Sequence, residues 1–236
     1  MTSIDFSVAV GAQRPSLTSL AHTAHAPDER GRRALNVVVA AFGIVVASPV
    51  FALVALAVKL TSRGPVIYRQ TRVGIDRRRH LGGNHRRTSD IGGHPFMMYK
   101  FRTMTEGEQG ASEQWATRDD PRVTAVGRVL RKYRLDELPQ LFNVLLGDMN
   151  VVGPRPEQPT ILASLREQIP GYAIRQRVRP GITGWAQINQ HYDTCVDDVK
   201  RKVTYDLEYV ARQSLAEDVK IMLKTVPTVA FRRGGW

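Results

Sequence analysis

A long, almost uncharged apolar stretch constrains this chain more than any other feature. The segment "ALNVVVAAFGIVVASPVFALVALAVKL", residues 34–60, carries one charge, Lys59 at its far end, and one strongly polar residue, Asn36. As a single α-helix it would be about 40 Å long, which exceeds the roughly 30 Å of hydrocarbon in a bilayer. The segment therefore predicts a helix that meets a membrane, and the simplest such helix crosses it.

Two features favour instead a helix that enters the membrane and returns. Ser48–Pro49 lies near the middle of the segment, and proline lacks the N–H that a helix needs, so a kink is expected there. Each arm would then be only about 18–23 Å long, too short to cross alone. Both ends also carry basic residues, which prefer the cytoplasmic side; these are Arg30, Arg32, Arg33, Lys59 and Arg63. We expect a re-entrant helix–break–helix hairpin, ahead of a spanning helix. A buried core helix is a third alternative, for which the segment is too long and too uniformly apolar.

The rest of the chain indicates an α+β fold. Residues 1–33 are small and polar, without the ordered parts of a signal peptide, and predict a flexible tail. Residues 61–236 predict a cytosolic globular domain that contains a small β element and amphipathic interfacial helices. Its expected parts are a strand over 64–74, a long basic loop over 75–94, a returning strand over 95–104 and an amphipathic helix near 214–231.

Charge narrows the class of partner. The chain has 236 residues, 42% of them hydrophobic, and a formal net charge of +12, which favours a polyanionic partner such as nucleic acid, anionic lipid or a phosphorylated substrate. The apolar segment and the lack of a recognisable binding module argue against nucleic acid. A single cysteine, Cys195, excludes an intramolecular disulfide and gives no zinc-type cluster.

Two adjacent carboxylates stand out in "RLDELPQLFNVLLGDMNVVGPRPE", residues 134–157. Proline is tolerated in the first turn of a helix, so Pro139 places Asp136 and Glu137 at or just before a helix N-terminus. Gly147 is a plausible end of that helix. Its predicted buried face consists of Leu138, Leu141, Phe142 and Leu145.

The neighbourhood of this pair favours chemistry over simple helix capping. Arg131 precedes it, and Arg155 follows between two prolines. The restricted backbone around Arg155 lets its guanidinium be aimed with little loss of entropy. Carboxylates placed at such a site predict either a bound cation or a reaction. Mg²⁺ prefers carboxylates together with phosphate oxygens, and a carboxylate can itself attack phosphorus.

Three sequence blocks carry a resemblance. "KFRTM" (100–104), "LDELPQLFNVLLGDMNVVGPRP" (135–156) and "RPGITGWAQIN" (179–189) resemble, in order and spacing, the signature blocks of the bacterial sugar transferase family. These are the monotopic phosphoglycosyl transferases, and this chain resembles their minimal form. The resemblance also implies the re-entrant membrane helix broken at a Ser–Pro pair.

The resemblance implies a covalent mechanism. Asp136 is the nucleophile that attacks the β-phosphate of a UDP-sugar and releases UMP, and Glu137 helps to hold Mg²⁺. Polyprenyl phosphate, typically undecaprenyl phosphate, then takes the phosphosugar from Asp136. Arg131 and Arg155 match family arginines that bind phosphate groups. No residue pattern selects the sugar, and a non-catalytic membrane scaffold with the same fold is the alternative.

Other residues of the blocks are ambiguous. Lys100, Arg102 and Arg179 line the substrate site or tie loops to the core, and Gln187 and Asn189 could contact ligand. The resemblance further implies a bacterial inner-membrane location with the catalytic domain facing the cytosol. It makes membrane lipid a partner, with downstream glycosyltransferases of polysaccharide or glycoconjugate assembly as further candidates.

Overall fold

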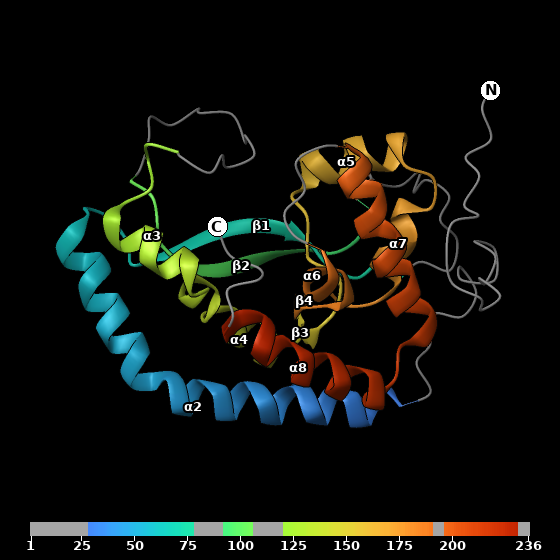
Figure 1. Ribbon diagram of the computed structural model, residues 1–236, viewed down its shortest axis with the longest axis horizontal. Helices are drawn as coiled ribbons and strands as arrows, with labels where there is room; N and C mark the ends of the chain where they lie inside the picture. The colour runs from blue at the N-terminus through green and yellow to red at the C-terminus, as the bar shows by residue number, and fades with distance from the viewer. Residues whose placement is uncertain (1–27, 78–91, 106–119, 191–195, 231–236) are drawn as a thin grey trace.

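The computed structural model describes residues 28–77, 92–105, 120–190 and 196–230. A long helix, α2 (Glu29–Thr61), runs along one side of the molecule, and the other elements lie on the inner side of its bend (Figure 1). It begins five residues before the predicted start at 34, inside the segment expected to be a tail. Most of the basic loop predicted over 75–94 lies outside the described residues.

The Ser48–Pro49 pair lies inside α2, where the helix changes direction (Figure 1). Pro49 cannot donate to the carbonyl of Val45 four residues earlier. The Ser48 hydroxyl donates to that carbonyl instead, at 2.8 Å. The chain therefore bends without leaving the helix, because the side chain before the proline replaces the missing donor. The bend agrees with the predicted kink, whereas the hairpin placement in a membrane stays a prediction.

The outer face of α2 is apolar and exposed. Among the described residues α2 is the one helix long and apolar enough to cross a membrane. Its exposed side chains are Val38, Phe42, Val45, Val46, Leu53, Leu56 and Leu60. Monomeric soluble proteins rarely expose so extended an apolar surface, so this face fits contact with lipid.

The inner face packs on the domain with both arms of the bend. Ala40, before the bend, lies in a core cluster with Val144, Val152 and Ile221. Val54 and Val58, after the bend, lie in a second cluster with Phe101 and Leu130. Full burial of such side chains stabilises a fold by about 1.5–3 kcal/mol each. Both arms are therefore part of the folded domain.

Polar contacts also join the first arm to the domain. The Arg32 Nε donates to Asp218 Oδ2 at 2.8 Å in a buried ion pair. The Asn36 Oδ1 accepts from the backbone N–H of Val151 at 2.5 Å. The Arg33 guanidinium donates to the carbonyls of Val144 and Leu145, which lie in the last turn of a short helix, where carbonyls have no N–H of a following turn to accept from. The Val144 carbonyl also accepts from the N–H of Gly147.

Two small sheets and several short helices complete the fold. Strands β1 (Ile67–Val73) and β2 (Pro95–Phe101) pair antiparallel, as predicted. Strands β3 (Asn150–Val152) and β4 (Gly181–Thr183) pair parallel and were not predicted. The described helices are α3 (Ala125–Lys132), η1 (Leu135–Glu137), α4 (Gln140–Leu146), α5 (Pro159–Gln168), η2 (Tyr172–Arg177), α6 (Trp185–Asn189), α7 (Val196–Arg212) and α8 (Leu215–Ala230). The α+β class is thus confirmed, and α8 matches the helix expected near 214–231.

A buried ion network joins the segment after β3 to η2 and α7. Arg175 pairs with Asp206 at 2.8 Å and with Glu157 at 3.3 Å, and Lys202 pairs with Glu157 at 3.0 Å. Burial alone would raise the pKa of Glu157, but Lys202 and Arg175 outweigh it and lower that pKa to about 2. Glu157 is therefore ionised and paired at neutral pH.

Candidate active site

The turn before α4 presents Asp136 and Glu137 to the domain interior. Arg134 adopts a left-handed conformation with φ of 54°, which costs a non-glycine residue about 1–2 kcal/mol. The chain then makes a single 3₁₀ turn and enters α4 after Pro139, whose φ is −62°. Asp136 and Glu137 are 8% and 7% exposed. Their predicted place just before a helix is confirmed, and α4 ends at Gly147 with φ of 91°, as expected.

The buried face predicted for α4 needs correction. Gln140, Asn143 and Val144 are the buried residues of this helix, whereas Phe142 is 42% exposed. The Phe142 ring packs edge-on against Phe51 of α2, with centroids 5.9 Å apart. The apolar side of α4 therefore faces α2. The Asn143 side chain faces the domain, where its Oδ1 accepts from the Tyr99 N–H and its Nδ2 donates to the Met97 carbonyl, both in β2.

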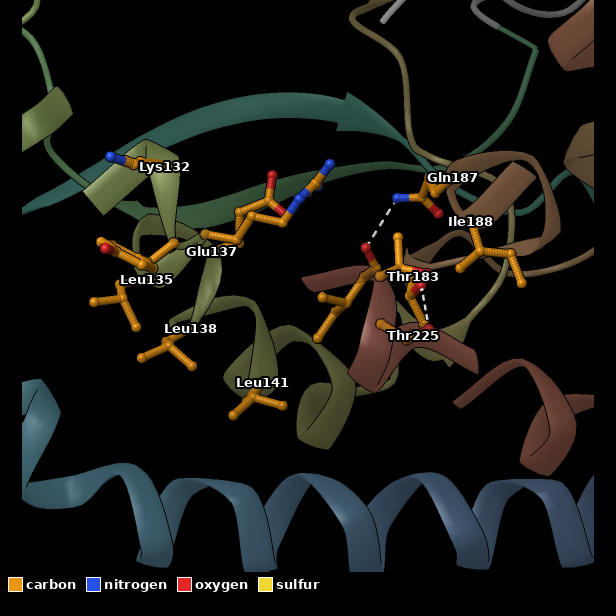
Figure 2. Close-up of a pocket in the computed structure, with 13 residues that line it drawn as sticks. Lys132, Leu135, Glu137, Leu138, Leu141, Thr183, Gln187, Ile188 and Thr225 are labelled. Carbon is orange, nitrogen blue, oxygen red and sulfur yellow. Dashed lines mark hydrogen bonds and ion pairs between the residues drawn. The ribbon is translucent and has the colours of Figure 1, made fainter. Parts of the chain in front are cut away.

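Glu137 is held by three cations. Its Oε1 accepts from Arg155 Nη2 at 2.6 Å and from Lys100 Nζ at 3.3 Å, and its Oε2 lies 3.6 Å from Arg134 Nη1. Burial would raise the pKa of Glu137, but Arg155 and Lys100 outweigh it and hold the pKa well below its usual range. Glu137 is therefore a fixed carboxylate. Figure 2 shows its side chain at the upper edge of a cavity.

Asp136 has a different environment from its neighbour. Burial raises its pKa above the usual range, and Glu137 adds to that effect, while Lys100, Arg155 and Arg131 oppose it. Within the described part of the chain its carboxylate accepts no hydrogen bond. A carboxylate that is buried among cations but bonded to none keeps its lone pairs available for reaction.

The predicted phosphate-binding residues fall into two groups. Lys100 and Arg155 contact Glu137 directly, and the charge of Arg131 acts on Asp136, while Arg131 Nε donates to Thr103 Oγ1 at 3.0 Å. Arg102 instead bonds to Ser62, the residue that caps the end of α2, and Arg179 pairs with Glu29 at its start.

In this structure Arg102 and Arg179 therefore tie the two ends of α2 to the domain, and their binding to phosphate stays a prediction. Arg134 was not singled out as a site residue. Its spacing of three residues from Glu137 could have indicated the contact.

The side chains near Asp136 and Glu137 limit how a metal ion could bind. No group of three or more His, Cys, Asp or Glu suitable for a metal occurs among the residues described. Two neighbouring carboxylates nevertheless fit Mg²⁺, which is usually bound through one or two carboxylates and completed by substrate phosphates and water. The pair at 136 and 137 fits such a shared site and does not fit a closed, all-protein metal cage.

A cavity of about 350 Å³ adjoins this site (Figure 2). Its walls come from the turn at η1, from α4, from β4 with α6, and from α8, and α2 passes beneath them. The lining residues are Lys132, Tyr133, Arg134, Leu135, Glu137, Leu138, Leu141, Ile182, Thr183, Gln187, Ile188, Thr225 and Thr228. One wall of the cavity is thus the same turn that carries the two carboxylates.

Comparison with known proteins identifies the family. The sequence profile of the bacterial sugar transferases matches residues 28–232. A UDP-N-acetylgalactosamine-undecaprenyl-phosphate N-acetylgalactosaminephosphotransferase of Aeromonas hydrophila is 41% identical over 198 residues, covering 84% of this chain and 43% of that protein. A UDP-glucose:undecaprenyl-phosphate glucose-1-phosphate transferase of Escherichia coli strain K12 is 44% identical over 198 residues, covering 83% of this chain and 39% of that protein.

A protein of the same name from Caulobacter vibrioides is 42% identical over 200 residues, covering 84% of this chain and 69% of the relative. The chain spans less than half the length of the first two relatives and about two thirds of the third. The matched region includes the bent helix, the carboxylate pair and the surrounding cations. This chain belongs to the bacterial sugar transferase family.

Proposed function

We propose that this chain transfers a sugar 1-phosphate from a UDP-sugar to polyprenyl phosphate through a phosphosugar intermediate on Asp136. The relatives' names support the donor and acceptor classes. The observation that carries the mechanism is the contrast within the carboxylate pair. Glu137 is bonded to cations, whereas Asp136 lies within their charge and accepts no hydrogen bond from any residue that the structure describes.

The first half-reaction forms the intermediate. A carboxylate oxygen of Asp136 attacks the β-phosphorus of the UDP-sugar, and the bond from that phosphorus to the bridging oxygen of the diphosphate breaks. UMP leaves with the bridging oxygen and its electron pair. Asp136 reacts as the carboxylate, so its raised pKa places the acid limit of this step above that of an ordinary aspartate.

The second half-reaction restores the enzyme. A phosphate oxygen of polyprenyl phosphate attacks the same phosphorus, and the bond between phosphorus and the Asp136 oxygen breaks. The products are the polyprenyl diphosphate sugar and the free carboxylate. No external oxidant, reductant or further reactant is needed.

Cations fixed near the reacting phosphorus would stabilise the charge that develops there. Lys100 and Arg155 are positioned by Glu137, and the charge of Arg131 also acts on Asp136. Loss of one such group typically lowers a rate about 10²–10³-fold. Glu137, with substrate phosphate oxygens, would hold Mg²⁺, which when bound neutralises charge on the diphosphate.

The bent helix α2 would place the reaction at the membrane surface. The acceptor phosphate lies at the headgroup level of a bilayer, and the nucleotide sugar is soluble. With the exposed face of α2 in one leaflet and both ends on the cytosolic side, Asp136 would lie where both substrates can reach it. We therefore propose attachment to the inner membrane with the domain facing the cytosol, at the first membrane step of surface glycan assembly.

The test separates the two half-reactions. Wild type incubated with UDP-glucose, UDP-N-acetylgalactosamine and other UDP-sugars should release UMP when Mg²⁺ is present. Intact mass should show an added hexose phosphate that polyprenyl phosphate removes. Asp136→Asn should abolish both signals. Asp197→Asn, which removes an exposed carboxylate paired with Lys200 on α7, should behave as wild type. Product formation by Asp136→Asn at the wild-type rate would rule the mechanism out.

A further inference from the structure

We propose that the cavity beside Glu137 binds the first isoprenoid units of the acceptor lipid. The proposal rests on the function proposed above and assigns one of its substrates to a defined place. The cavity volume of about 350 Å³ lies within the ~300–1,000 Å³ usual for small-molecule pockets. It can hold the start of a long lipid and leave the remainder in the bilayer.

The cavity wall is apolar where a ligand would lie. Leu135, Leu138 and Leu141 lie on one side and Ile188 on the other (Figure 2). Ile182 also lines the cavity. Apolar cavities of this kind bind apolar groups in preference to water. The branched, methyl-bearing units of a polyprenyl chain fit these walls, and the polar rings of a nucleotide do not.

The threonine hydroxyls of the wall and the Gln187 side-chain nitrogen are hydrogen-bonded within the protein, whereas the buried Gln187 Oε1 has no hydrogen-bond partner among the described residues. The hydroxyls of Thr183 and Thr225 share a hydrogen bond of 2.8 Å, and the Thr228 hydroxyl donates to the backbone carbonyl of Lys224 in α8 at 2.8 Å. The Gln187 amide donates to the Ile182 carbonyl at 2.9 Å. The remaining oxygen of Gln187 lies on the side of Gly184, within 2.8 Å of where a Cβ would stand. The wall therefore offers few polar groups to a sugar or a base.

Charge at one end of the cavity fits a phosphate head. Lys132 and Arg134 line the cavity together with Glu137. Asp136 is not itself among the lining residues, but its chain neighbours Leu135 and Glu137 are. A lipid seated between the leucines would therefore have its phosphate at the turn that carries the nucleophile. This arrangement brings the attacking oxygen to the intermediate by position, which is a large source of rate in bimolecular reactions.

The cavity also adjoins the surface that fits lipid. The Leu141 side chain packs against α2 at Gly43. A Cβ added to Gly43 would lie 3.2 Å from a methyl group of Leu141. On α8, Thr225 and Thr228 line the cavity, while Leu223 and Val226 on the same helix are each 68% exposed. An isoprenoid chain can therefore pass from the apolar outer surface of the protein to the cavity without leaving apolar contact.

The experiment fills the cavity and measures each half-reaction. Thr228→Trp and, independently, Ile188→Trp place a large ring in it, and Lys200→Trp places the same ring on the exposed face of α7, away from the cavity, as the control. UMP release without acceptor reports the donor step. Discharge of the isolated phosphosugar adduct by geranyl, farnesyl and undecaprenyl phosphate reports the acceptor step. Equilibrium dialysis of farnesyl phosphate measures binding without any reaction.

In wild type, discharge and binding should strengthen from geranyl to farnesyl phosphate, because more apolar surface enters the cavity. Thr228→Trp and Ile188→Trp should slow discharge about tenfold relative to UMP release and weaken farnesyl phosphate binding, and Lys200→Trp should match wild type.

Discharge and binding that match the control in both cavity variants would overturn the proposal. So would a loss of UMP release with discharge intact, since the cavity would then belong to the nucleotide sugar. Failure of wild type to form any adduct would instead refute the function, and the dialysis result would still decide whether the cavity binds isoprenoid.

Discussion

Removal of the Lys100 charge should shift the acid limit of UMP release upward. Lys100 Nζ lies 3.3 Å from Glu137 Oε1, and its charge is the largest of those that lower the pKa of Asp136 against the effect of burial. A nearby cation favours the charged form of a carboxyl and lowers its pKa. Lys100→Met should therefore raise the pKa of Asp136 further above its usual range.

The sign of the effect follows from the reacting form. Asp136 attacks as the carboxylate, so a higher pKa leaves less of the reactive form at mildly acidic pH. We expect the acid limb of UMP release, measured in single turnover from pH 4 to 9 with UDP-sugar in excess, to move to higher pH in Lys100→Met. Lys100→Arg, which keeps the charge, should restore most of the wild-type profile.

Charge removal elsewhere provides the control. Lys220→Met removes an exposed cation of α8 that pairs with Glu217, and it should leave the acid limb in place. Two results would contradict the role given to Lys100 and the assignment of Asp136 as the titrating nucleophile. One is an acid limb of UMP release that stays in place in Lys100→Met, and the other is an acid limb that moves equally in Lys220→Met.

Three further outcomes are expected. Ser48→Ala should lower the free energy of unfolding by about 0.5–1.5 kcal/mol in detergent, because the Val45 carbonyl loses its donor at the bend; no change would show that this bond is dispensable. Glu157 has a pKa of about 2 in the folded chain against 4.5 ordinarily, so it should stabilise the fold by about 3 kcal/mol above pH 4.5 and lose that contribution as the pH falls toward 2. Unfolding temperatures of wild type and Glu157→Gln should therefore converge on acidification, and parallel pH profiles would refute the linkage. Asn36→Leu should cost about 1–3 kcal/mol, since the buried N–H of Val151 loses its acceptor, and urea unfolding that matches wild type would contradict this.

Local patterns in the sequence predicted those elements whose cause is itself local. The length and apolarity of 34–60 predicted the helix, and the proline predicted its bend. The strands that became β1 and β2 follow from β-favouring residues on either side of a basic segment. Pro139 predicted the helix start that places the carboxylate pair.

Features that depend on distant contacts could not be predicted this way. Strands β3 and β4 are three residues each and pair in parallel across about thirty residues of chain, so no alternation reveals them. The exposure of Phe142 follows from the position of α2, which α4 alone does not encode. The bonds of Arg102 to Ser62 and of Arg179 to Glu29 also depend on where the ends of α2 lie.

The contacts of Arg32, Arg33 and Asn36 with the domain bear on how such an enzyme can be handled. Deleting the apolar helix to obtain a water-soluble fragment would remove the partner of the Asp218 carboxylate in α2 and the acceptor of the Val151 N–H. It would also expose the core residues that pack against α2. Because the helix and the domain are joined rigidly on both sides of Pro49, the depth of the helix in a leaflet would also set the height of the nucleophile above it. Lengthening the first arm by one turn should therefore uncouple the enzyme from its acceptor while the soluble donor still reacts.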